Sequence, residues 1–210
     1  MLQGTFSITA RCPRSGQFGV AVASKYLAVG AVVPFVRAGV GAVATQARGN
    51  PLFGPEGLDL MLEGVPPETI LERFAATDTD WEHRQVHMID ARGRSACHTG
   101  AETVAWAGHR TGQDCTVAGN ILTGPEVLDA MLAAFQADPN EPLARRLMAA
   151  LLAGDRAGGD RRGKQSAALL VVDREPYPIV NIRVDDHPDA TSELARIFDL
   201  FGNAFPRSIR

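Results

Sequence analysis

The chain has 210 residues, of which 45% are hydrophobic and 21% charged, and its formal net charge is −3. A chain of this length buries most of its apolar surface without disulfide or metal staples, and its charge balance argues against a nucleic-acid-binding surface. No apolar stretch reaches the roughly 18 residues that span a bilayer, and the three cysteines form no CxxC pair. We therefore expect a bacterial-type cytoplasmic protein with reduced cysteines that binds neither nucleic acid nor membrane.

The first third of the chain is typical of β-strands. Residues 5–11 alternate apolar Phe6, Ile8 and Ala10 with polar residues, which is the period of a strand. A turn at 13–16 leads into a second strand over 18–23, so that the two segments form a hairpin. Further strands are expected over 31–36 and 40–46, where glycines indicate bends or close backbone approach.

Helices and strands then follow in blocks. Apolar residues at helical spacing predict two helices between residues 58 and 74, two more over 127–135 and 143–152, and a terminal helix over 194–201. Strands are expected over 84–90, 95–99, 104–108, 115–118, 167–172 and 179–184. This order favours two sheets between helical layers over a doubly wound parallel sheet, which needs strict alternation of strand and helix.

An internal repeat supports a two-part architecture for one domain, residues 1–210. Residues 49–62 align with residues 119–132 at a constant offset of 70, and ten of the fourteen positions are identical. Each copy contains a Gly-Asn turn followed by Gly-Pro-Glu, which favours a helix start. Two interpretations stay open. Either both copies are simply good helix starts, or Asn50 and Asn120 present donors at the mouth of one cleft.

A glycine-rich loop over 158–165 carries Asp160, Arg161 and Arg162. It resembles the phosphate-binding loop of NTPases, but Gln165 stands where that loop needs a hydroxyl, and the segment leads from a helix into a strand. We therefore reject nucleotide hydrolysis. The loop either lines a site for a carboxylate-bearing ligand or is a solvated surface loop.

The histidines do not predict a metal site. His83 and His87 are four residues apart in a segment expected to be a strand, where this spacing separates them by about 13 Å. The Asp-Asp-His-Pro-Asp segment at 185–189 is explained by a turn before a helix. Because a metal needs convergent ligands with fixed geometry, we expect no metal and no other cofactor.

Thr5 carries the sharpest hypothesis, since it starts the first strand directly after Gly4. A threonine hydroxyl needs a base to act as a nucleophile, and an N-terminal threonine supplies its own α-amine. The ordinary pKa of that amine, about 8, leaves part of it neutral at cytoplasmic pH. This chemistry requires the loss of residues 1–4. The alternative is an ordinary threonine early in an edge strand.

Several motifs together resemble one family. They include TFSITAR at 5–11, GVAVASK at 19–25, AGVGAVATQ at 38–46, Gly119-Asn120, GGDRRG at 158–163 and VDDHPD at 184–189. Over essentially its whole length, the chain resembles the domain of unknown function 1028 family, which is grouped with the N-terminal nucleophile (Ntn) hydrolases. The resemblance implies an α+β fold, a four-layer αββα sandwich that is Ntn-hydrolase-like.

The Ntn resemblance also implies hydrolysis of an amide or related C–N bond, with Thr5 as the nucleophile. Ser24 and Lys25 would orient its amine or lower the pKa of that amine. Asn120 and the backbone amides around Thr45 and Gln46 would form an oxyanion hole, and Arg161 or Arg162 would anchor a substrate carboxylate. The expected substrate-binding residues are Thr45, Gln46, Asn50, Asp160, Arg161 and Arg162.

The sequence leaves functions of different classes open. The first is an Ntn-type hydrolase of a small carboxylated metabolite, with residues 1–4 removed. The second is a non-catalytic protein that binds a small ligand on the same fold and keeps its N-terminus intact. A third is a subunit whose role is assembly, and a homodimer is expected by default because two-fold homo-oligomers are common.

Overall fold

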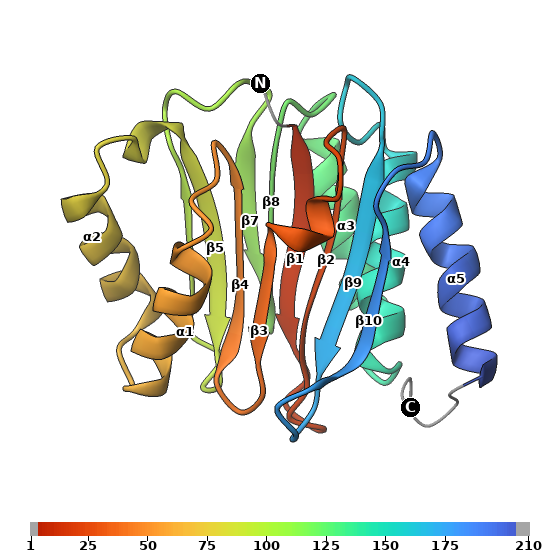
Figure 1. Ribbon diagram of the computed structural model, residues 1–210, viewed down its shortest axis with the longest axis horizontal. Helices are drawn as coiled ribbons and strands as arrows, with labels where there is room; N and C mark the ends of the chain where they lie inside the picture. The colour runs from red at the N-terminus through yellow and green to blue at the C-terminus, as the bar shows by residue number, and fades with distance from the viewer. Residues whose placement is uncertain (1–3, 205–210) are drawn as a thin grey trace.

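The computed structural model describes residues 4–204, except for the side chain of residue 203, so part of the segment expected to be removed, residues 1–3, lies outside the described residues. The helices and strands follow the block order expected from the sequence (Figure 1). The strands are β1 Thr5–Arg11, β2 Phe18–Ser24, β3 Pro34–Arg37, β4 Gly41–Ala47, β5 Arg84–Asp90, β6 Ser95–Thr99, β7 Gly108–Gly112, β8 Cys115–Asn120, β9 Ser166–Val172 and β10 Pro178–Val184. The α-helices are α1 Phe53–Leu62, α2 Pro67–Thr77, α3 Glu126–Gln136, α4 Leu143–Arg156 and α5 Ala190–Ala204.

The strands form two antiparallel sheets that face each other, and the described part of the chain is a mixed α+β fold with five α-helices. One sheet has six strands in the order β10-β9-β2-β1-β8-β7, and the other has four in the order β3-β4-β5-β6. Helices α3, α4 and α5 cover the outer face of the larger sheet, and α1 and α2 cover the outer face of the smaller one (Figure 1). The expectation of an α+β fold with two sheets is therefore confirmed.

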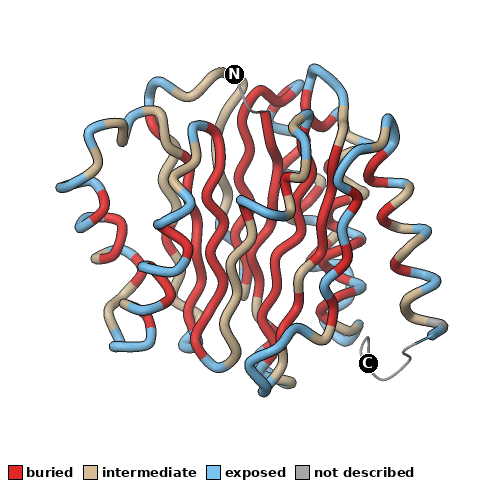
Figure 2. Tube along the Cα trace, viewed as in Figure 1, coloured by how far each residue is buried: buried red, intermediate tan, exposed pale blue. Residues whose placement is uncertain are grey.

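The alternation within β1 explains why this strand lies at the centre of the molecule. Phe6 and Ile8 point to the helical side, where they pack with Leu147 and Leu151 of α4. Ser7 and Thr9 point to the other sheet, where both bond to His87. Both faces of the strand are covered, so the central strands are buried along almost their whole length (Figure 2).

Two of the strand predictions are wrong in their position. The strand expected over 31–36 is β3, but it covers only Pro34–Arg37, because the chain before it forms a short 3-10 helix over Val29–Ala31. Local hydrogen bonds of this 3-10 turn, such as the one from the Val33 amide to the Val29 carbonyl, take the place of the strand-to-strand bonds expected there. The segment 104–108 is a loop up to residue 107, because the carbonyls of Val104 and Trp106 accept the amides of Ile121 and Leu122, and the strand there is β7.

The two copies of the repeat differ at their asparagines. Asn120 is the last residue of β8, whereas Asn50 lies in the loop after β4 has ended. The following helices also start differently, since Pro55 lies inside α1 while Pro125 immediately precedes α3. The repeat therefore predicts two strand-to-helix connections, but it does not make the two asparagines equivalent.

Candidate functional site

The six-stranded sheet brings four polar side chains into one row across neighbouring strands. Thr5 of β1 lies opposite Ser24 of β2 on one side and opposite Asn120 of β8 on the other. Ser24 in turn lies opposite Ser166 of β9. Directly opposed residues of an antiparallel sheet share a face, and Thr5 shares its face with Ser7 and Thr9 by the two-residue period of the strand. The side chains of this row therefore point toward the smaller sheet, at the end of the larger sheet where β1 begins.

A chain of hydrogen bonds joins Thr5 to the peptide bond that precedes it. The Thr5 hydroxyl donates to Ser24 Oγ at 3.1 Å, and the Ser24 hydroxyl donates to the carbonyl oxygen of Gly4 at 2.5 Å. Thr5 is 2% exposed and Ser24 is fully buried, so water does not compete strongly for these bonds. The nucleophile expected from the sequence thus lies one hydroxyl away from the carbonyl of the Gly4–Thr5 bond.

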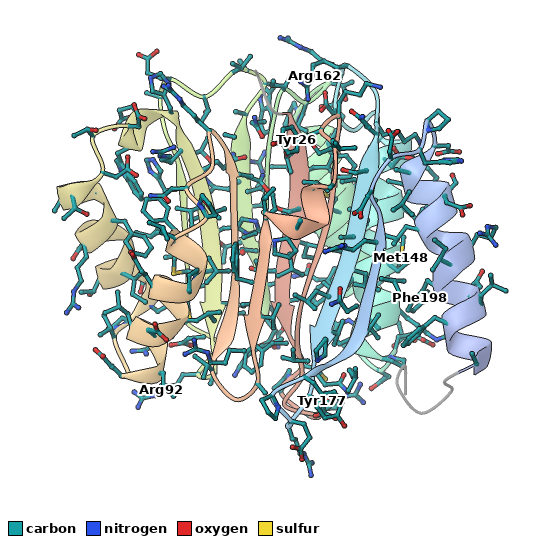
Figure 3. The ribbon with its side chains drawn as sticks, viewed as in Figure 1. Tyr26, Arg92, Met148, Arg162, Tyr177 and Phe198 are labelled. Carbon is teal, nitrogen blue, oxygen red and sulfur yellow. The ribbon has the colours of Figure 1, made fainter. Side chains whose placement is uncertain are left out.

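The glycine-rich loop closes over Gly4 from the other side. Arg162 Nη2 donates to the Gly4 carbonyl at 3.3 Å and also binds the carboxylate of Asp160 at 2.6 Å. The side chain of Asp160 is 1% exposed and accepts the backbone amides of Lys25 and Arg162 as well. Arg162 lies at the end of the molecule where β1 begins (Figure 3). The carbonyl oxygen of Gly4 therefore has two donors, one neutral and one cationic.

Gly4 is confined by this loop to a space that holds no side chain. A Cβ atom on Gly4 would lie 2.5 Å from Asp160 Oδ2 and 2.8 Å from Arg162 Nη2. Real Cβ atoms do not approach other heavy atoms this closely, so a larger residue would displace the Asp160–Arg162 pair. The glycine that precedes Thr5 is thus required by close approach.

The other cationic side chains near the start of β1 have different partners from Arg162. Lys25 contributes its backbone amide to Asp160, while its ammonium group donates to the carbonyl of Lys164. Lys25 and Lys164 line a cavity of about 230 Å³ together with His187. Arg161 is exposed, and its backbone amide bonds to the Ile121 carbonyl. The cation that reaches the Gly4 carbonyl is therefore Arg162 and not Lys25.

The other expected site residues divide into two groups. Asn120 is 2% exposed and lies in the row with Thr5. Asn50 is directed elsewhere, because its side-chain amide donates to Asp78 at 3.2 Å and its oxygen accepts the Leu52 amide. The Thr45 hydroxyl donates to the Asn50 carbonyl, and the Thr45 amide donates to Val33. Asn50 and Thr45 thus bind their own loop and strand, and the structure does not bring them to Thr5.

A buried polar network between the sheets was missed in the sequence. His87, which the sequence analysis considered only as a metal ligand, is fully buried and bonds to Ser7 at 2.8 Å and to Thr116 at 2.7 Å. Ser7 donates to Gln46 Oε1 at 2.5 Å, so it accepts from His87 Nε2. His87 is therefore the neutral tautomer that donates from Nε2 and accepts from Thr116 at Nδ1. The alternating polar residues Ser7 and Thr9 of β1 are the sequence feature that could have indicated this network.

The environment of His87 agrees with this neutral form. Burial lowers the pKa of His87 to about 3, and the charge of His109 adds to the effect. The network also fixes the strand that carries Asn120, because Gln46 donates to the Ala118 carbonyl and Gln85 donates to the Gly119 carbonyl. A neutral, fully bonded histidine is suited to hold strands in place rather than to transfer protons at neutral pH.

Among residues 4–204, no group of three or more His, Cys, Asp or Glu side chains is arranged to hold a metal ion. The segment at 185–189 forms a turn in which His187 Nδ1 accepts the amide of Asp189, while Asp186 accepts a bond from Gln165. The same part of the chain contains no helix with the length and hydropathy needed to cross a membrane.

Comparisons with known proteins are in line with this architecture. A family model described as a family of unknown function, DUF1028, matches residues 5–194, a range that begins at Thr5. A crystal structure of a DUF1028 protein from Silicibacter pomeroyi is similar, with 33% sequence identity and a TM-score of 0.87, over 95% of this chain and 89% of that chain. No curated protein matches the sequence.

Proposed function

We propose that this chain, which belongs to the DUF1028 family, is an Ntn-type hydrolase of an amide or related C–N bond in a small carboxylated metabolite. The observation that carries the proposal is the hydrogen-bonded chain from the Thr5 hydroxyl through Ser24 to the Gly4 carbonyl. In this proposal, the two facing sheets and their outer helices are an Ntn-like αββα sandwich, with the nucleophile at the start of a central strand.

The first step of the proposed chemistry is removal of residues 1–4 by the chain itself. The Thr5 hydroxyl oxygen attacks the Gly4 carbonyl carbon, its proton passes to Ser24, and the Ser24 proton passes to the Gly4 oxygen. Collapse of this adduct breaks the Gly4–Thr5 C–N bond, returns a proton to the nitrogen and leaves Gly4 as an ester on Thr5. This collapse already frees the α-amine of Thr5. Water then hydrolyses the ester, which regenerates the Thr5 hydroxyl and releases residues 1–4 with a new carboxylate on Gly4.

The second step reuses the same donors on a substrate. The free α-amine accepts the Thr5 hydroxyl proton during attack on the substrate carbonyl and later returns it to the leaving amine. Ser24 and Arg162, which donate to the Gly4 oxygen, would then stabilise the developing oxyanion of the substrate. Asn120 lies beside Thr5 in the same row and supplies a further candidate donor.

The carboxylate of the substrate would bind the cations around this row. Arg162 is already paired with Asp160, so the exposed Arg161 and the Lys25 ammonium are better placed to bind a second anion. The cavity beside Lys25, about 230 Å³, offers space for a small acid rather than a large ligand. This supports a small carboxylated substrate and gives Lys25 a binding role in place of amine activation.

The experiment that tests the proposal separates processing from turnover. A shortened chain that begins Met-Thr5, from which the host removes the initiator Met, carries the free amine without any cleavage by the chain itself. This protein and its Thr5→Val variant are incubated with N-acyl amino acids and with side-chain amides of acidic amino acids, and amine release is measured. Thr5-dependent release supports the hydrolase, whereas equal release by both proteins rules it out.

The alternative is a non-catalytic protein that binds a small ligand and keeps its N-terminus. The enclosure of Gly4 by the Asp160–Arg162 pair favours it, because this contact would hold residue 4 in place. It predicts that the full-length chain stays intact and that a ligand raises the melting temperature without product. Steady turnover by the shortened chain would exclude this alternative.

A further inference from the structure

A second cavity lies at the other end of β1, where the strand turns into β2. It has a volume of about 450 Å³, which is within the range of small-molecule sites. The turn after β1, the β7–β8 hairpin and the connection between α3 and α4 all contribute to its walls. The polar side chains among its lining residues are Cys12, Arg14, Gln113, Asp114, Gln136, Asn140 and Arg146.

The cavity is separate from the Thr5 row. Thr5 begins β1, and Cys12 follows its last residue, so the two lie about 23 Å apart at the rise of an extended strand. The two ends of β1 lie at opposite ends of the molecule (Figure 1). A molecule bound here would therefore be a second ligand and not the substrate of the proposed hydrolase.

The charge of Arg146 is the feature that points to a ligand. Arg146 belongs to α4 and is only 8% exposed, yet among residues 4–204 no carboxylate lies within ion-pair distance of it. Its Nε donates to the Phe135 carbonyl at 3.0 Å, and its guanidinium stacks over the Phe135 ring at 3.9 Å. Buried charges in proteins are usually paired, and a guanidinium stays charged even when burial lowers its pKa, as it does here.

The remaining groups around the cavity keep its potential positive. Asp114 lines the cavity, but its carboxylate is bound by Arg11 Nε at 2.6 Å. Arg14 stands at the rim, where it bonds to Asn140 and to the Pro139 carbonyl. Among the lining residues, Arg14 and Arg146 thus outnumber the one carboxylate, Asp114, which is itself paired with Arg11.

The Cys12 thiol, which lines the cavity, has several hydrogen-bond donors around it. Burial raises the pKa of Cys12, but hydrogen bonds from Ser15 and from the backbone of Arg14, together with the Arg14 charge, outweigh this effect. The pKa of Cys12 is therefore lowered, mainly by hydrogen bonds within its own turn and to a smaller extent by the charge of Arg14. Cys115, which is buried away from these donors, has its pKa raised by burial to about 12.

From this geometry we infer that the cavity is a binding site for a small oxyanion, a carboxylate- or phosphate-bearing metabolite that pairs with Arg146. A planar guanidinium held on one face by an aromatic ring presents its Nη atoms along one edge, which matches two oxygens of such an anion. The side-chain amides of Gln113, Gln136 and Asn140 supply polar groups around the anion.

Calorimetric titration at constant ionic strength tests this site with inorganic phosphate and with succinate as probes, and with chloride as the reference anion. The full-length protein should bind at least one of the two probes at one site per chain. Arg146→Met should weaken that binding at least tenfold. Arg145→Met is the matched control, since Arg145 is the neighbouring residue of α4 with its side chain 52% exposed, and it should leave the affinity unchanged.

A second variant keeps the test decisive if Arg146→Met does not fold. Arg14→Met changes a rim residue and should weaken binding about threefold, while circular dichroism should show an unchanged fold. Preference for phosphate or for succinate identifies which anion the site takes, and either result supports it. Failure of both probes to bind the wild type, or equal affinity in wild type and Arg146→Met, would overturn the inference. Thr5→Val should bind the anion normally, which separates this site from the proposed function.

Discussion

The Ser24 hydroxyl donates a hydrogen bond of 2.5 Å to the carbonyl oxygen of Gly4, the residue that immediately precedes Thr5. Ser24 Oγ also accepts a hydrogen bond from the Thr5 hydroxyl. One side chain therefore contacts both partners of the proposed cleavage, the attacking hydroxyl and the carbonyl that it attacks. Ser24 is therefore in position to relay the Thr5 proton to the Gly4 oxygen during cleavage.

Ser24→Ala should slow cleavage at Thr5 by at least about 100-fold, because removal of one donor to a developing oxyanion typically costs this much. The rate is measured by intact mass spectrometry of the full-length chain over time. Ser166→Ala is the matched control, since Ser166 lies next to Ser24 in the same row but bonds to Tyr26 and Val29. It should lower the melting temperature and leave the cleavage rate within about twofold; equal slowing in both variants would contradict the role of Ser24.

Gly4→Ala should slow cleavage about tenfold or more, which corresponds to about 1.4 kcal/mol of activation free energy. The new Cβ would lie 2.5 Å from Asp160 and push Arg162 away from the carbonyl. Gly57→Ala in α1 serves as the control, because its Cβ would meet only ordinary contacts at 3.5 Å and beyond. That control should be neutral or stabilising, as is usual when alanine replaces glycine in a helix. Unchanged cleavage in Gly4→Ala would show that the loop does not govern the Gly4 carbonyl.

Arg162→Ala should reduce the free energy of unfolding by about 2–3 kcal/mol, because it leaves the buried Asp160 carboxylate without its cation. Asp160→Asn combined with Arg162→Ala removes that charge and should restore at least half of the loss. Urea denaturation of the two single variants, the double variant and the wild type gives the coupling between the two residues. Additive losses would mean that the pair does not act as a unit.

His87 should make the protein less stable as the pH falls below about 6.5. Its pKa is about 3 in the folded chain and ordinary in the unfolded chain, so in this window the unfolded state binds the additional proton. The free energy of unfolding should fall by about 1.4 kcal/mol per pH unit from this residue between pH 6 and pH 4. His87→Gln should remove that slope, whereas His187→Gln, at a surface turn, should keep it. If the free energy of unfolding of His87→Gln kept the same pH dependence, a residue other than His87 would be responsible for it.

The fold could be predicted from the sequence wherever a local pattern determines structure. The alternation of residues 5–11 predicted β1, and the helical spacing of Leu143, Leu147 and Leu151 predicted α4. The segment at 31–36 was misplaced because a local 3-10 turn over Val29–Ala31 occupies its start. The segment at 104–108 was misplaced because its carbonyls bond to Ile121 and Leu122, partners that no local pattern identifies.

The site could be predicted only in part for a related reason. Thr5, Ser24 and Asn120 were identified from motifs, but their alignment in one row depends on the register of three strands, which is set by the whole sheet. The orientation of the Asn50 side chain depends on Asp78, a residue in the turn after α2. His87 was overlooked because its partners Ser7 and Thr116 come from distant strands.

Whether the chain frees the Thr5 amine is tested by the intact mass of the freshly purified full-length protein and of the same sample after incubation at neutral pH. A species beginning at Thr5 should accumulate in the wild type and be absent in Thr5→Val. A wild-type chain that keeps residues 2–4 throughout the incubation would contradict the account, because Thr5 would then have no α-amine to act as its base.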